Sequence, residues 1–182
     1  MRLGPGVVAF LAGAILATEP ASAGDASAAF LANLFVEACV PHLGQPDQVR
    51  EWALSRGLKR IEEAKGRAAV VGSGGKGEAW SVPSADGSFA LSLRGETGSC
   101  AVWAQKTAAA DALSLFQTLV ESVAGAGVDL HVERDEAGAG RRLLTYEAEA
   151  PGAGAVFEFT LLTLDRPDAL YQAMMEAGRG GE

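Results

Sequence analysis

The chain has 182 residues and carries 23 acidic against 15 basic side chains, which gives a formal net charge of −8. This balance argues against nucleic acid as a partner, because nucleic-acid binding needs clustered Lys and Arg on phosphates. The negative charge also argues against adsorption to anionic lipid. We therefore expect the mature chain, without its N-terminal signal, to make no membrane contact.

The first 23 residues have the pattern of an export signal. Arg2 supplies a positive start, residues 7–17 are apolar, and Ala21-Ser22-Ala23 is a small-x-small cleavage site. Cleavage after Ala23 leaves residues 24–182, a length that suits one domain with its own core. No later stretch is long and apolar enough to span a bilayer. We therefore predict a soluble periplasmic or secreted protein, with an uncleaved signal that anchors the chain as the alternative.

The two cysteines, Cys39 and Cys100, both follow the predicted signal. An oxidising compartment and an even count favour a disulfide between them. A loop of this length stabilises a fold by about 4 kcal/mol on the chain-entropy model. Two unpaired buried thiols and a redox pair are the alternatives, although redox pairs usually sit in a Cys-X-X-Cys motif.

The first part of the mature chain, residues 24–70, reads as helical. Apolar residues recur at helical spacing over 26–39, which predicts a first helix. A second short helix is expected to begin near Asp47 and to end at Gly57. The mixed charges of 58–68 indicate solvated surface.

The pattern changes near Gly72 to a period of two, which is typical of strands. Strands are expected at 78–82, 88–94 and 99–105, and Asp86-Gly87 predicts a hairpin between the first two. A helix then follows to about Ala124, with Thr107 as its cap.

The last third of the chain predicts three more strands and a final helix. The strands are expected at 128–134, 142–149 and 155–164. A bulge or a strand end is expected where Leu161 and Leu162 interrupt the alternation, and the helix should open at Pro167. The resulting fold class is α+β. We expect two N-terminal helices and an antiparallel sheet of about six strands in βββα-βββα order, with helices packed on one face.

Five features along the chain resemble those of a group of small exported proteobacterial proteins without a known function. They are Cys39 on the first helix, Gly77-Glu78-Ala79-Trp80, Gly98-Ser99-Cys100, the alanine-rich central helix and Gln172-Ala173-Met174. The resemblance extends over most of the mature chain and includes the cysteine pair. It implies no activity, cofactor or catalytic residue.

The run from Gly72 to Gly77 has the spacing Gly-x-Gly-x-x-Gly. A dinucleotide loop needs a helix directly after the glycines to hold the pyrophosphate, whereas the residues that follow this run predict a strand. We therefore interpret the run as a flexible connection and expect no nucleotide cofactor.

The polar residues suggest no complete catalytic or metal site. His42 follows Cys39 with Cys-x-x-His spacing, but pairing of the two cysteines would remove both sulfur ligands, so no metal is expected. Ser73 and Ser99 lie among glycines, and only Ser99 with His131 forms a conceivable nucleophile and base. A second alternative is a hydrolase with carboxylates on adjoining strands, the candidates being Glu133, Asp135, Glu136, Glu147 and Glu149.

The aromatic residues divide into core and surface candidates. Six phenylalanines fall at inward positions and are expected in the core: Phe30, Phe35, Phe89, Phe116, Phe157 and Phe159. Trp80 and Trp103 are the candidates for a partner surface, since Trp103 points away from Val102 on its strand. Our leading hypothesis is a non-enzymatic periplasmic or secreted domain that binds an envelope protein or a small apolar ligand. The alternative is a cell-envelope hydrolase that uses the surface carboxylates.

Overall fold

The computed structural model describes residues 23–72, 76–95, 98–124, 127–149, 152 and 154–180. Of the predicted export signal, only Ala23 falls within these ranges, where it begins the first helix; Ser73 lies outside them. The described residues form an α+β fold around one antiparallel sheet, which confirms the predicted fold class in its broad form.

The helices are α1 (Ala23–Ala38), α2 (Pro46–Ser55), α3 (Ala64–Val71) and α4 (Ala109–Ala124), with a 3-10 turn at Val40–His42. The strands of the first half are β1 (Lys59–Arg60), β2 (Gly77–Pro83), β3 (Ser88–Arg94) and β4 (Ser99–Gln105). Those of the second half are β5 (Asp129–Gly138), β6 (Arg141–Glu149), β7 (Val156–Leu164) and β8 (Ala173–Arg179).

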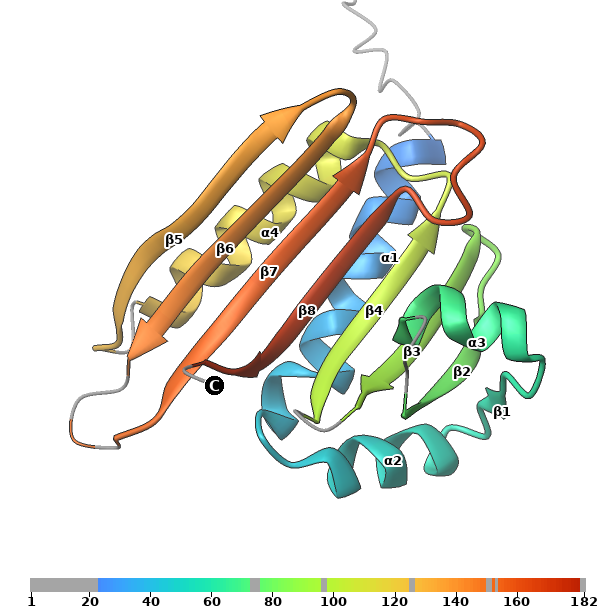
Figure 1. The fold of residues 1–182 in the computed structure, drawn as a ribbon, viewed down its shortest axis with the longest axis horizontal. Helices are drawn as coiled ribbons and strands as arrows, with labels where there is room; N and C mark the ends of the chain where they lie inside the picture. Colours follow the sequence, from blue (N-terminus) through green and yellow to red (C-terminus); the bar gives the residue numbers. More distant parts are fainter. Residues whose placement is uncertain are drawn as a thin grey trace, which may run out of the picture.

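The eight strands of the described chain lie in the order β1-β2-β3-β4-β8-β7-β6-β5, and every neighbouring pair is antiparallel. Two three-stranded meanders, β2–β4 and β5–β7, therefore flank the C-terminal strand β8, which joins them at the centre (Figure 1). The hairpin predicted at Asp86-Gly87 is confirmed, since β2 and β3 pair along their full length.

Two helices, α1 and α4, pack side by side on one face of the sheet and bury the main core (Figure 1). Its largest fully buried side chains include Phe35, Phe116, Phe159 and Trp80. All six phenylalanines expected in the core belong to it or pack against it. The short helix α3 lies on the opposite face, where Val70 and Val71 cover β2 and β3.

The predicted disulfide between Cys39 and Cys100 is confirmed. The Cα atoms of the two residues are 5.4 Å apart, and both side chains are buried in the main core. The bond ties the end of α1 to the first pairs of β4, across 61 positions of sequence. No described cysteine is left unpaired, so the alternative of two unpaired thiols is wrong.

The sheet has eight strands rather than about six, and the final helix predicted after Pro167 is wrong. Residues 173–179 form β8, which pairs with β4 on one side and with β7 on the other. Two ladders of hydrogen bonds outweigh the moderate helix propensity of a segment that contains two methionines. The sequence of the segment alone does not show that it lies between β4 and β7 in the sheet.

The charged side chains of 58–68 are exposed or partly exposed as expected, but the expectation of only two helices before the main strands is wrong. Lys59 and Arg60 pair with β2, and α3 begins directly afterwards. The carboxylate of Glu63 caps α3 by accepting a hydrogen bond from the Gly66 backbone N–H at 3.0 Å. The sequence does not predict this helix, because its first residues are charged or small and its buried apolar residues, Val70 and Val71, come only at its end. Since α3 lies on the face opposite α1 and α4, the helices do not all pack on one face of the sheet as was expected.

The irregularity of the sheet lies in β5 rather than at Leu161 and Leu162. The register of β7 runs without a break through both leucines, whereas β5 shifts between Val132 and Arg134. Val132, the last residue before the shift, is 52 % exposed although it pairs with the buried Tyr146. The predicted cap, Thr107, is buried with no hydrogen-bond partner for its hydroxyl among the described residues.

Candidate functional site

The outward side chains of β5–β8 form a surface that we call the open face. On this side of the sheet α3 lies over β2 and β3 only, and the described helices leave β5–β8 uncovered (Figure 1). Most outward side chains of the open face are exposed or partly exposed, whereas Thr145 and Met174 are buried.

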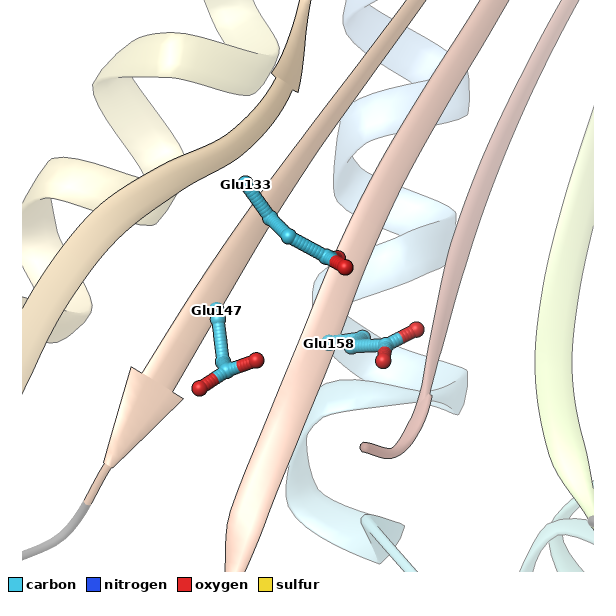
Figure 2. A group of neighbouring side chains, drawn as sticks. All are labelled: Glu133, Glu147 and Glu158. Carbon is cyan, nitrogen blue, oxygen red and sulfur yellow. The ribbon is translucent and has the colours of Figure 1, made fainter. Parts of the chain in front are cut away.

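Three glutamates from adjacent strands converge on the open face (Figure 2). One carboxylate oxygen from each of Glu133, Glu147 and Glu158 lies within 4.8 Å of the others. Glu147 and Glu158 are direct cross-strand partners, which holds their side chains next to each other. The glutamate cluster thus concentrates negative charge at one place on the surface.

A β-bulge positions the third member of the glutamate cluster. Glu133 has no partner in β6, because Val132 pairs with Tyr146 and the next pair is Arg134 with Thr145. The extra residue shifts the alternation of the strand by one position. Asp135 therefore pairs with Leu144, on the face covered by α4, where its carboxylate accepts two hydrogen bonds from Arg142, at 3.0 and 2.8 Å.

Polar residues surround the glutamate cluster on the neighbouring strands. The Nε2 atom of His131 lies 3.6 Å from Oε1 of Glu147. On β8, the largely buried carboxylate of Glu176 accepts hydrogen bonds from Arg94 Nη1 at 2.6 Å and from Ser99 Oγ at 2.5 Å. The charge of Glu176 is therefore already paired with Arg94.

An apolar row also lies on the open face, separated from the glutamate cluster by the polar row of Thr145, Thr160 and Glu176. Leu143, Leu162, Met174 and Trp103 occupy successive cross-strand positions of β6, β7, β8 and β4. The ring of Trp103 is half-buried, with its centroid 5.7 Å from that of Tyr171, and its Nε1 donates to Ser92 Oγ at 2.9 Å. Burial raises the pKa of the Tyr171 phenol. The row is covered at its Trp103 end and partly exposed at Leu143 and Leu162.

The two tryptophans predicted as a partner surface have different environments. Trp80 is fully buried in the main core, so its side chain offers no surface to a partner in this fold. Trp103 keeps partial exposure at the edge of the apolar row. Trp103 points away from the core as expected, and Tyr171 packs against its ring.

The histidines and serines considered as site residues are not brought together. Ser99 on β4 and His131 on β5 are separated by three strands, which is about 19 Å at the usual strand spacing. His42 lies 3.1 Å from the Gln48 side-chain oxygen, and Cys39 beside it is held in the disulfide. The Gly72–Gly77 run leads into β2, as the prediction of a following strand requires.

Of the five carboxylates predicted to line adjoining strands, the structure gathers two. Glu133 and Glu147 belong to the glutamate cluster, whereas Glu136 pairs with Leu143 and Glu149 lies at the end of β6, opposite Val156. Sequence reasoning missed Glu158. Its outward position between Phe157 and Phe159 was the available signal.

A cluster of this kind has two chemical capacities. Carboxylate oxygens are the preferred ligands of hard cations such as Ca²⁺. A pair of carboxylic groups can also act as the general acid and the general base of a hydrolysis. A hydrolase also needs a cavity that holds the substrate beside these groups. The three described cavities, of about 830, 260 and 270 Å³, are lined by other residues.

Comparison with known proteins adds no relative to this picture: no family model, curated protein or solved structure matches the chain. None of the described helices is both long and apolar enough to cross a lipid bilayer.

Proposed function

We propose that the protein is an exported binding domain without catalytic activity of its own, and that its open face engages a partner protein with a basic contact surface. The observation that carries this proposal is the glutamate cluster, which shares the uncovered half of the sheet with a partly exposed apolar row. Carboxylates complement cations on the partner, and the leucines give the contact an apolar centre.

The charge of the molecule supports a basic partner. The whole chain carries a net charge of −8, so its field attracts a cationic surface from a distance, and the cluster sets where that surface docks. A protein partner is favoured over a small apolar ligand by the size of the apolar groove between α1 and α2. This groove, lined by Phe30, Trp52 and Leu58 among others, measures about 270 Å³. Ligand pockets usually measure about 300–1,000 Å³.

Export to the periplasm or beyond is part of the proposal. The disulfide between Cys39 and Cys100 supports it, because such bonds persist in oxidising compartments. The signal-like pattern of the first 23 residues supports it independently.

The test is capture of partners from an envelope extract with two matched triple variants of the mature chain. One replaces the cluster (Glu133→Gln, Glu147→Gln, Glu158→Gln), and the other replaces three exposed glutamates elsewhere (Glu51→Gln, Glu62→Gln, Glu121→Gln). Both variants lose the same formal charge. We expect the cluster variant to bind the captured protein at least about tenfold more weakly at low salt, and the control variant to bind it as the unaltered chain does. Equal binding by the two variants would overturn the proposal.

A cell-envelope hydrolase remains the second candidate because Glu133 and Glu147, two of its predicted carboxylates, do meet on the open face. Its test is turnover of a panel of glycoside and ester substrates by the purified chain. Turnover that Glu147→Gln abolishes and Glu51→Gln leaves unchanged would establish the hydrolase. The binding proposal predicts no turnover by any of the three proteins.

A further inference from the structure

Strand β8 is the last of the described strands in chain order, but it lies at the centre of the sheet. The other strands all precede it, and it pairs with β4 on one side and with β7 on the other (Figure 1). Met175 sits between Val102 of β4 and Leu161 of β7, and all three side chains are fully buried. Before β8 is in place, β4 and β7 therefore each lack the hydrogen-bond ladder along one edge.

The hydrophobic core is continuous through β8. The inward side chains of the strand are Ala173, Met175 and Ala177, and all three belong to the main core. Both helices that cover this core, α1 and α4, contact the strand. Without β8 the core has a gap at Met175, and the apolar side chains on both sides of the gap meet water, which opposes folding.

Polar contacts at β8 also join the two meanders. Directly before the strand, the backbone N–H of Gln172 donates to the Ala104 carbonyl at 2.9 Å, and the Gln172 carbonyl accepts from the Leu164 N–H at 2.8 Å. Within the strand, the Glu176 carboxylate accepts from Arg94 Nη1 at 2.6 Å. The segment thus connects β3 and β4 with β7 through its backbone and through a side chain.

We propose that β8 is a closing strand, which means that the sheet and its core form only after residues 173–179 have left the ribosome. The first meander, β2–β4, leaves the ribosome first, and chains generally fold in that order during synthesis. Here that meander has an unpaired edge at β4 beside an incomplete core, so it stays unfolded until β8 arrives.

The closing strand gives the order of folding a role in export, and this part rests on the proposed export of the protein. The general secretion channel passes unfolded chains, whereas twin-arginine signals belong to a separate route. The signal-like segment has one arginine, Arg2, and no arginine pair. The disulfide between Cys39 and Cys100 does not form in a reducing cytoplasm either. A chain that lacks both this bond and β8 therefore stays unfolded, as the channel requires, while it is being made.

The experiment measures the folding force on the ribosome during translation of residues 24–182, which a linker joins to a translational arrest peptide. Folding close to the ribosome pulls on the arrest peptide and releases it, so full-length product appears. A short linker leaves residues 173–179 inside the exit tunnel with β7 outside, and a longer linker brings them just outside. Oxidised glutathione allows the disulfide to form in both reactions.

We expect release of the arrest peptide with the longer linker only. Release with the short linker would show that the first seven strands fold without β8, and would overturn the proposal. No export takes place in this assay, so its outcome is independent of whether the protein leaves the cell.

Two matched variants test whether β8 is the source of the force. Met175→Asp places a charge at a fully buried position of β8, and Leu170→Asp places the same charge on the β7–β8 connection, where the side chain is 54 % exposed. With the longer linker, we expect Met175→Asp to lose the release and Leu170→Asp to keep it. Equal release from both variants would overturn the proposal.

Hydrogen exchange of the purified mature chain gives a second measure. If β8 closes the fold, its amides become exposed only when the whole sheet opens. We therefore expect the Met175 amide to exchange as slowly as that of Leu91, a fully buried residue of β3. Much faster exchange at Met175 would show that β8 detaches while the other strands stay folded, which contradicts the proposal.

Discussion

The two halves of the sheet are covered differently. Strands β2 and β3 have the main core on one face and α3 on the other, and the neighbouring strand β4 carries the disulfide to α1. Strands β5 and β6 have α4 on one face, while their outward side chains reach solvent. β3 is accordingly buried from Phe89 to Leu93, whereas every residue of β5 except Leu130 is exposed.

This difference indicates a division of roles. A strand that is covered on both faces has a nearly continuous apolar sequence. An edge strand with one solvent-exposed face instead carries charges that keep it from pairing with other chains. We infer that the β2–β4 half sets the stability of the fold and that the β5–β8 half provides the contact surface.

The largest expected effect concerns the cross-link of the first half. Replacing both Cys39 and Cys100 by Ala should lower the free energy of unfolding by about 4 kcal/mol on the chain-entropy model, since the bond closes a loop across 61 positions. Urea denaturation of the variant and of the oxidised parent measures the difference. Equal midpoints would show that the disulfide does not stabilise this half.

A smaller effect is expected when side chains on the same side of the sheet are shortened in the two halves. Val70 on α3 is fully buried, so Val70→Ala should cost about 2 kcal/mol of unfolding free energy. Leu162 lies on the open face with partial exposure, and Leu162→Ala should cost less than about 1 kcal/mol although it removes more atoms. Urea denaturation of both variants checks the order of the two costs, and the reverse order would contradict the proposed division.

The smallest effect concerns repulsion within the glutamate cluster. Glu133→Gln should stabilise the fold by up to about 0.5 kcal/mol at low salt, because it removes one of three neighbouring negative charges. The gain should vanish in 0.5 M salt, where exposed charges are screened. Thermal unfolding at the two salt concentrations measures it, with Glu121→Gln on α4 as the control. A gain that persists in salt would have a cause other than repulsion.

The sequence predicted those elements that follow one period and pair locally. The strands at 88–94 and 99–105 were predicted with their observed bounds, because their alternation is regular and glycines mark the turns. The disulfide was predictable as well, since a chain with two cysteines has a single possible pairing.

The remaining elements depend on contacts that are distant in the sequence. Residues 173–179 form a strand because they pair with β4 on one side and β7 on the other. Helix α3 is held in place by the packing of Val70 and Val71 on β2 and β3. The glutamate cluster was predictable in part: alternation places Glu133, Glu147 and Glu158 outward, but the pairing of β5, β6 and β7 that brings the three together is not visible in any one strand. The cavity of about 830 Å³ joins residues from α2, β2 and β8, which only the folded sheet brings together.

The most direct test of the central claim is photo-crosslinking in the envelope of cells that produce the protein. A photoreactive amino acid is placed at Leu162 on the open face or at Leu54, an apolar residue of α2 that is 61 % exposed. We predict one adduct of defined mass from position 162 and none from position 54. No adduct from position 162, or the same adduct from both positions, would contradict the assignment of the open face as the contact surface.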